Sequence, residues 1–242
     1  MFDGTYDAST KRAYFVLART PLEKGADPDR ASHCLPAGPI LVALDTTNDQ
    51  FVDLNGDAGG VALSLLGENP TAFVPDLANR RLFLVDAGCY VAPDGGTGEA
   101  GADAQASYER RGRGIEEVSL ESLTSKWRYQ HMSPQRLSGL VWVDDAHAYV
   151  SLDDGPPAFT TRWYALNTDP MTLGGEVKDF PLYAPRRVGS HVLGIATVNL
   201  DGSTSNALVE FDPASGEATT LVGDIFGDAR FSAAYTGWAP IP

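Results

Sequence analysis

The stretch FVDLNGDAGG, residues 51–60, carries oxygen-bearing side chains that could hold a calcium ion. Asp53, Asn55 and Asp57 have the spacing that opens a calcium-binding loop. Such a loop closes with an acidic residue at its ninth or twelfth position, and this chain has none at either place. Asn-Gly is also the pair that favours a tight turn between strands. The pattern therefore favours a turn, and weak calcium binding by these three residues is the second interpretation.

Histidine and aspartate side chains offer a second place for chemistry. His33 and His131 fall in segments between the strand-like runs described below, where an acid–base or metal cluster could form. Three aspartates could join them: Asp86, Asp153 and Asp154. No two histidines have the close spacing typical of zinc sites. His147 and His191 occupy equivalent places after turns, where packing accounts for them.

Several motifs of catalysis and cofactor binding are absent from the sequence. The chain contains no G-x-S-x-G, no phosphate-binding P-loop and no G-x-G-x-x-G. Its glycine run GGTGEAG, at 95–101, lacks the lysine and the following helix that a phosphate loop needs. We therefore expect no cofactor apart from the weak calcium candidate.

Charge and hydropathy argue against two classes of partner. The formal net charge is −14, so the surface repels phosphate backbones and nucleic acid is not expected as a partner. No apolar run reaches the length of roughly 18 residues that a membrane-spanning helix needs. The first residues, MFDGTYDAST, lack the basic and apolar regions of a signal peptide.

Strands must position these residues, because strand-like patterns fill the chain and helical periodicity is absent. Four similar runs rich in Val, Leu, Tyr, Phe and Ile are predicted as strands: RAYFVLA at 12–18, RLFLVDA at 81–87, HAYVSLD at 147–153 and HVLGIAT at 191–197. The first three follow a polar turn and an earlier short strand, which predicts a hairpin used three times.

A second pattern follows these runs: an apolar-alternating strand, a polar turn and a final strand. Residues that can bond the backbone of their own turn are expected at one repeated place: Asp45, Glu121, Asn167 and Asp212. Four-stranded units of roughly 40–50 residues indicate a β-propeller. We predict an all-β fold, a single β-propeller domain over residues 1–242. Its four recognisable blades are 2–70, 71–134, 135–183 and 184–230, with 231–242 as an orphan strand.

The segments ILVALDTTNDQFVDLNGD and GENPTAFVPDLANRRLFLVDAG resemble the YVTN-type β-propeller repeat. In that repeat a strand ends in Asp-Thr-x-Thr, an outer strand follows, and Asn-Pro precedes a strand pair with a charged hairpin. The residues that carry the resemblance are Asp45, Thr46, Thr47, Asn69, Pro70 and Arg80–Leu82. Family members usually have more blades than the four recognisable here, so this chain could be part of a larger propeller. Open blade edges would then allow self-association.

In a propeller, the connection from the second to the third strand of a blade shares a rim with the connections between blades. The second-to-third connections are the long ones, at 19–38, 88–112 and 154–161. Long loops on a rigid scaffold commonly carry function. These loops are acidic, so we predict a negatively charged binding rim: Asp27, Asp29, Asp86, Asp94, Asp103, Asp153 and Asp154.

The two cysteines, Cys34 and Cys89, fall in the long connections of neighbouring blades. The repeat places them on one rim, so a disulfide between them is expected, and two free thiols are the alternative. A disulfide would indicate an oxidising compartment. We therefore expect a periplasmic, cell-surface or secreted protein whose leader is absent from this chain.

Two functions remain open. The first is a non-catalytic binding propeller that presents its acidic rim to a protein or a glycan. The second is a metal-dependent, lactonase-like hydrolase with its site at the central channel. The connections between blades would supply Glu68, Asn69 and His131 to that site, but Arg186 comes from the same kind of connection and would lie poorly beside a cation. The missing catalytic motifs and the acidic rim favour binding over catalysis.

Overall fold

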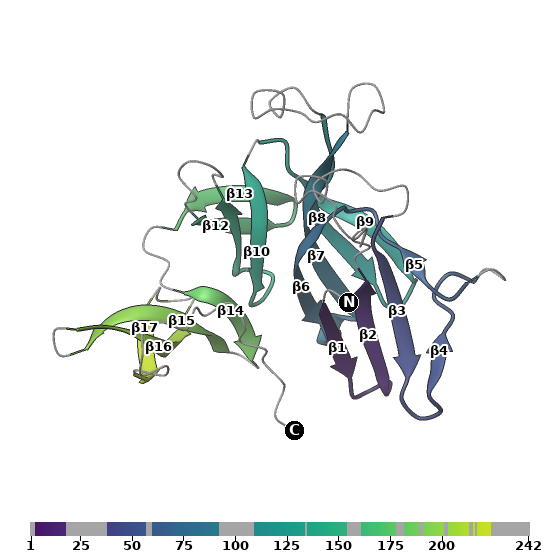
Figure 1. Ribbon diagram of the computed structural model, residues 1–242, viewed down its shortest axis with the longest axis horizontal. Helices are drawn as coiled ribbons and strands as arrows, with labels where there is room; N and C mark the ends of the chain where they lie inside the picture. Colours follow the sequence, from purple (N-terminus) through teal and green to yellow (C-terminus); the bar gives the residue numbers. More distant parts are fainter. Residues whose placement is uncertain are drawn as a thin grey trace, which may run out of the picture. The chain divides into compact units, whose positions relative to one another are not determined.

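A computed structural model of the chain describes residues 3–17, 38–56, 60–91, 109–133, 135–153, 161–177, 182–188, 191–200, 203–212, 215 and 217–223. This part of the chain consists of antiparallel β-sheets and a short 3-10 helix, Leu77–Asn79 (Figure 1). None of its helices is long and apolar enough to cross a membrane.

The first two sheets belong to one compact unit. The first sheet has the order β1-β2-β3-β4, and β5 also pairs with β3. Its strands are β1 (Asp3–Asp7), β2 (Arg12–Leu17), β3 (Ile40–Asp45), β4 (Gln50–Val52) and β5 (Leu63–Ser64). The second sheet consists of β6 (Pro70–Asp76), β7 (Arg81–Val91), β8 (Glu109–Ser119) and β9 (Thr124–Gln130), in that order.

Most of the third sheet and all of the fourth belong to a second compact unit. The third sheet consists of β10 (Arg136–Trp142), β11 (Ala148–Asp153), β12 (Thr161–Thr168) and β13 (Met171–Glu176). The fourth consists of β14 (Tyr183–Val188), β15 (His191–Leu200), β16 (Ser203–Phe211) and β17 (Ala218–Val222). Both sheets keep their strands in sequence order.

This strand order confirms the predicted fold class, an all-β β-propeller with four blades of antiparallel strands. The sheets span residues 3–64, 70–130, 136–176 and 183–222. Two of them begin one residue before the predicted blade boundaries, at Pro70 and at Tyr183. The predicted orphan strand, 231–242, lies outside the described residues.

Each unit has its own apolar core, because alternating side chains of a strand point to opposite faces of the sheet. In the first unit, Tyr14 of β2 and Leu84 of β7 belong to one buried cluster and are 1% and 0% exposed. In the second unit, Val141 of β10 and Val209 of β16 belong to another. Neighbouring blades of the same unit therefore bury apolar faces against each other.

The short turns of the first two blades end in the same way. Lys11, Asp49, Arg80 and Leu123 each precede a strand, with left-handed φ angles of 57°, 56°, 54° and 53°. A residue with a Cβ adopts this conformation at a cost of roughly 1–2 kcal/mol. The strand pairing on either side of each turn therefore outweighs a local backbone cost.

A side-chain oxygen at the end of the preceding strand supports these turns. Asp45 Oδ1 accepts hydrogen bonds from the Thr47 hydroxyl (2.6 Å) and backbone N–H (2.9 Å), which lower the pKa of Asp45. In the second blade the equivalent residue is Ser119, whose Oγ accepts the N–H of Ser122 (3.1 Å). The prediction of Glu121 at this place was wrong, because β8 ends at Ser119 and Glu121 lies within the turn.

The stretch FVDLNGDAGG interrupts the outer strand of the first sheet. β4 and β5 both pair with β3, and the chain leaves the sheet between them. Asp53 Oδ1 accepts the backbone N–H groups of Asn55 (3.1 Å) and Gly56 (2.8 Å), while Leu54 is buried in the core. Asp53 therefore stabilises a turn, as the favoured interpretation predicted. Asp57 lies outside the described residues, so calcium binding stays a prediction.

The β7–β8 hairpin continues beyond its sheet, as Figure 1 shows. Its pairing runs to Val91 opposite Glu109, whereas β6 pairs with β7 only as far as Asp86 and β9 pairs with β8 only as far as Gly114. We call residues 89–91 and 109–111 the second-sheet arm. The predicted long loop at 88–112 is therefore shorter than expected, because both of its ends are strand.

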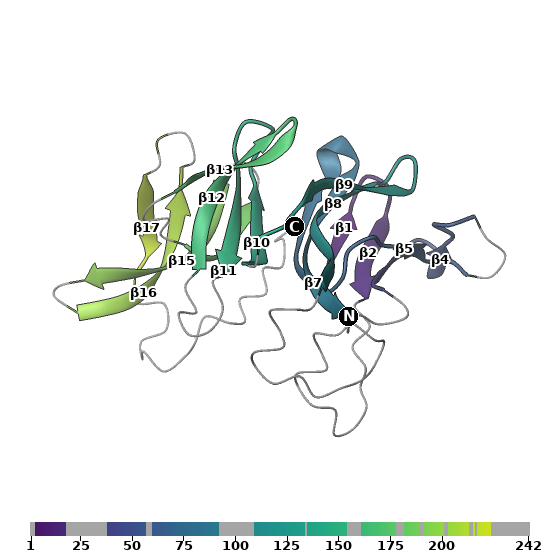
Figure 2. The same cartoon turned by 90° about the horizontal axis from the view of Figure 1, so that it is seen from above.

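The β15–β16 hairpin does the same in the fourth sheet (Figure 2). Its pairing runs to Leu200 opposite Ser203, whereas β14 stops opposite Ile195 and β17 stops opposite Leu208. We call residues 197–200 and 203–206 the fourth-sheet arm. Both arms join the second to the third strand of their blade.

Candidate functional site

The end of the second sheet from which its arm projects gathers buried charged side chains. β7 brings Asp86, β8 brings Arg113 and Glu116, and His131 follows β9. These four residues are 0%, 8%, 0% and 4% exposed. Burying charge is costly unless the group is paired or neutralised. This concentration makes the end of the sheet the candidate functional site.

Asp86 lies on the face of β7 that also carries Leu84, in the core with the first sheet. Neither of its carboxyl oxygens has a hydrogen-bond partner among the described residues. Burial, followed by the negative charges of Glu116 and Glu68, raises the pKa of Asp86 well above its usual value. The prediction of Asp86 on an exposed rim was wrong, because alternation along β7 turns it inward.

The carboxylate of Glu116 binds the backbone of the connection between the first and second sheets. Its two carboxylate oxygens accept the backbone N–H groups of Leu66 and Gly67, each at 2.9 Å. The hydroxyl of Ser125, on β9, also donates to it. Hydrogen bonds to charged groups contribute about 1.5–3 kcal/mol each. Glu116 therefore holds this connection against the sheet.

Two glycines let the same connection lie close to the sheet. A Cβ added at Gly67 would lie 2.0 Å from Cγ of Asp86, and one at Gly112 would lie 2.6 Å from Cγ of Glu68. The Glu68 N–H donates to the C=O of Gly112 (2.9 Å), and the N–H of Gly88 donates to the C=O of Glu68 (2.9 Å). The connection thus closes over the Asp86 carboxyl.

Arg113 holds the connection between the second and third sheets. Its guanidinium donates to the backbone C=O of Ser133 and to that of Gln135 (2.8 Å). The N–H of His131 donates to the C=O of Arg113 (3.2 Å), and the Tyr129 hydroxyl lies 3.0 Å from His131 Nδ1. Burial raises the pKa of Tyr129, and the charge of Arg113 opposes that shift.

The three residues predicted for a hydrolase site all lie at this end of the second sheet. Glu68 packs on Gly112 and His131 bonds to Arg113. Asn69 is exposed, with a left-handed φ of 56°. Within the described residues, no group of three His, Cys, Asp or Glu side chains could hold a metal ion.

Most of the predicted binding rim lies outside the described residues: Asp27, Asp29, Asp94, Asp103 and Asp154. His33 also lies outside them. Asp153 ends β11 and is half-buried. Cys89 is a buried residue of β7. Because Cys34 lies outside the described part, its disulfide with Cys89 stays a prediction.

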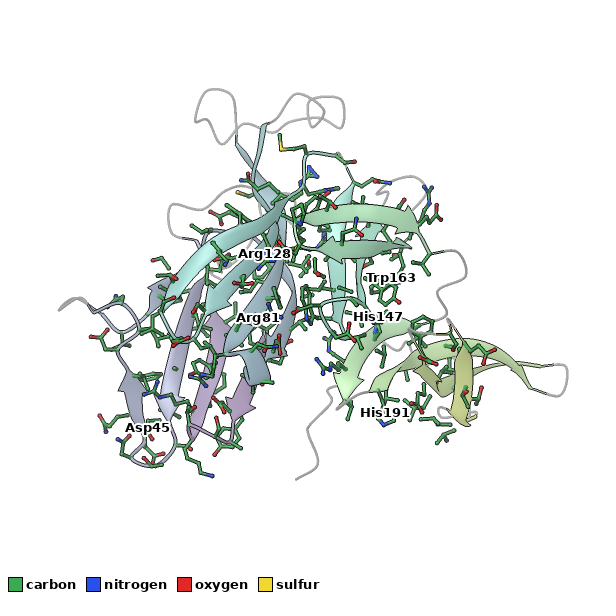
Figure 3. All side chains as sticks on the ribbon, turned by 180° about the vertical axis from the view of Figure 1, so that it is seen from behind. Asp45, Arg81, Arg128, His147, Trp163 and His191 are labelled. Carbon is green, nitrogen blue, oxygen red and sulfur yellow. The ribbon has the colours of Figure 1, made fainter. Side chains whose placement is uncertain are left out.

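Sequence reasoning missed Glu116 and Arg113, whose partners are distant in sequence. β8 reads ERRGRGIEEVS, and its two consecutive glutamates point to opposite faces of the sheet, with Glu116 toward the core. Glu117 accepts Lys126 Nζ (3.0 Å) and Arg128 (2.8 Å) in an ion-pair network that also includes Arg81. Figure 3 labels Arg81 and Arg128 on this sheet. This second cluster is structural.

Comparisons with known proteins yield no family model that matches this chain and no curated protein that matches it. The geometry of the sheets and their connections is therefore the support for a function.

Proposed function

We propose that this protein is a non-catalytic binding propeller of the YVTN type. It presents the second-to-third strand hairpins of its blades to a protein or a glycan. The observation that carries the proposal is the pair of arms, which extend the β7–β8 and β15–β16 hairpins beyond their sheets.

The arms differ from the turns at the other end of the same strands. At the other end of β7 and β8, the β6–β7 and β8–β9 connections are short turns that are held by local hydrogen bonds. The arms add strand length that pairs with no other strand of the described part. Segments that a rigid scaffold projects without needing them for its core are where binding residues concentrate. Each arm therefore supports a binding role for the end of its own blade.

The buried acid at the arm's base supports binding over hydrolysis. Asp86 is 0% exposed, so a substrate has no access to its carboxyl. Within the described residues, no group of three His, Cys, Asp or Glu side chains could hold a metal ion. A lactonase-like site needs acid, base and metal ligands that converge on one reacting atom. A binding surface on the hairpin ends does not require such residues to converge on one atom.

The proposal extends to the setting of the protein. We place it in an oxidising compartment, at a cell envelope or outside the cell, with a Cys34–Cys89 disulfide that fixes the base of the second-sheet arm. The net charge of −14 favours a basic or cation-bridged partner over nucleic acid. Such an association is faster at low salt, because salt screens charges beyond a Debye length of about 8 Å at physiological ionic strength.

The arm can be tested by removing its tip. Replacing residues 92–108 by Asn-Gly joins Val91 to Glu109, which are paired in the hairpin, and leaves the sheet intact. The intact and shortened chains are screened against an immobilised glycan array and a phage-displayed library of short peptides. We expect ligands of the intact chain to bind the shortened chain at least tenfold more weakly.

The matched control is Glu121→Lys, which reverses a charge in the β8–β9 turn at the opposite end of the sheet. We expect it to keep the binding of the intact chain. A parallel screen for lactone hydrolysis with added divalent metals tests the enzyme alternative. Metal-dependent turnover that is lost in Glu68→Gln or His131→Gln would overturn the binding proposal.

A further inference from the structure

An asparagine–glycine pair lies exposed in the turn that interrupts the outer strand of the first sheet. β4 ends at Val52 and β5 begins at Leu63, and Asn55 and Gly56 lie between them, outside the strand pairing. Gly56 has a φ of 71°, and a Cβ added to it would meet no atom of the described residues within 4 Å. Neither the ladder nor a described neighbour therefore confines the backbone at Gly56.

Asparagine followed by glycine has a covalent chemistry of its own. When the glycine N–H gives its proton to water, its nitrogen can attack Cγ of the asparagine. A bond forms between that nitrogen and Cγ, the Cγ–Nδ2 bond breaks, and ammonia leaves a succinimide ring. Water then opens the ring at Cγ to give aspartate, or at the backbone carbonyl carbon to give isoaspartate. Glycine favours ring closure because it has no Cβ and the least restricted backbone.

Asp53 acts on the nitrogen that would attack. Its Oδ1 accepts the backbone N–H groups of Gly56 (2.8 Å) and Asn55 (3.1 Å). Hydrogen bonds to a charged acceptor are stronger than those between neutral groups. A neighbouring negative charge also disfavours the loss of a proton, because it opposes the anion that would form. Asp53 therefore resists the first step of ring closure.

The core fixes one side of this turn independently of Asp53. Leu54 is 1% exposed and belongs to the buried cluster of the first unit. Its N–H donates to the C=O of Val61 (3.0 Å), across the turn. Opening of the backbone at Gly56 therefore breaks the hydrogen bonds to Asp53 while the sheet stays paired.

We propose that the Asn55–Gly56 bond is a self-modification site, at which Asn55 converts to aspartate and isoaspartate at a rate that Asp53 limits. The product carries a new carboxylate beside Asp53, and isoaspartate also lengthens the backbone of the turn. Both changes oppose the hydrogen bonds that Asp53 makes in the unmodified chain. The inference is independent of the proposed binding function.

Asn48 provides a comparison within the same molecule. It is exposed in the turn between β3 and β4, and its Oδ1 accepts the N–H of Gln50 (3.0 Å). The residue after it is Asp49, whose Cβ hinders attack by the backbone nitrogen. Asn48 should therefore keep its amide while Asn55 is converted.

The test incubates the full chain at neutral pH and follows both asparagines by mass spectrometry of peptides, with isoaspartate and aspartate separated by chromatography. We expect conversion at Asn55 and none at Asn48. Asp53→Ala should speed conversion at Asn55 by about threefold or more, because a hydrogen bond to a charged group no longer has to break. The matched control, Asp45→Ala, removes the equivalent turn support at Thr47 and should leave the rate at Asn55 unchanged.

The same chains unfolded in guanidinium chloride separate the effect of the fold from that of the sequence. The difference between Asp53→Ala and the unchanged chain should vanish there, because the turn no longer exists. No conversion at Asn55, or equal conversion at Asn48, in the unchanged folded chain would overturn the site, whether or not Asp53→Ala folds. A folded Asp53→Ala chain that converts no faster, or a difference that persists after unfolding, would overturn the role of Asp53.

Discussion

At the scale of single residues, the second blade neutralises buried charge with backbone groups. Glu116 accepts backbone N–H groups, and Arg113 donates to backbone C=O groups. Asp86 has no hydrogen-bond partner of either kind in the described part of the chain. Its remaining way to avoid a buried charge is to keep its proton.

This difference predicts how stability depends on pH. The unfolded chain loses the Asp86 proton near pH 4, whereas the folded chain keeps it to higher pH because its pKa is raised. The free energy of unfolding therefore falls as pH rises above about 4, until the folded pKa is reached. Asp86→Asn stays neutral, so it should remove this fall and raise stability at pH 7. Each unit of pKa difference corresponds to about 1.4 kcal/mol.

Urea unfolding at several pH values between 4 and 8 measures the effect. Glu121→Gln is the matched control, because it neutralises an exposed carboxylate in a turn of the same blade. An Asp86→Asn profile that falls as steeply as that of the unchanged chain would contradict a protonated carboxyl at this position.

At the scale of elements, the sequence predicted strands well and the ends of strands poorly. Period-two alternation and turn residues located the four blades, because those signals are local. The prediction of Asp86 as a rim residue failed because it did not apply alternation along the predicted strand, which puts Asp86 on the same face as Leu82 and Leu84. The roles of Glu116 and Arg113 depend on connections that are distant in sequence, which no local pattern reports.

The left-handed turns allow a test of local backbone cost. Lys11 is exposed and has a φ of 57°, which glycine adopts without steric cost. Lys11→Gly should raise the free energy of unfolding by about 0.5–1 kcal/mol, after allowing for the extra freedom of glycine in the unfolded chain. Lys11→Ala, which keeps the Cβ, is the control and should give no gain. If urea unfolding gives Lys11→Ala a higher free energy of unfolding than Lys11→Gly, the turn is not strained.

At the scale of the whole molecule, cohesion comes from two apolar cores, one in each compact unit. The Arg80–Asp7 ion pair adds a polar link between the turns of the first and second blades. The pKa of Asp7 is about 2, because hydrogen bonds from Ser9, Thr10 and Arg80 outweigh the effect of burial. The two blades of this unit are therefore joined at their turns as well as through their core.

The two cysteines provide a test that concerns the whole chain. If Cys34 and Cys89 are bonded, unreduced protein unfolded in denaturant should show no reactive thiol, and reduction should release both. Closing a loop of this length stabilises a fold by about 4 kcal/mol in the chain-entropy account, so reduction should lower the urea midpoint. Two thiols that react before reduction would rule out the bond and remove the argument for an oxidising compartment.

The two arms are expected to be less stable than the sheets from which they extend. A two-stranded ribbon without a third strand is only marginally stable in water. The pairs Val91–Glu109 and Leu200–Ser203 therefore separate at a small free-energy cost, while the ladders behind them stay closed. In deuterated solvent the amide hydrogens at the outer ends of both ribbons should exchange long before those of the blade interiors. The hairpin ends therefore open and close while the blade interiors stay paired, so a ligand can bind the arms in more than one conformation.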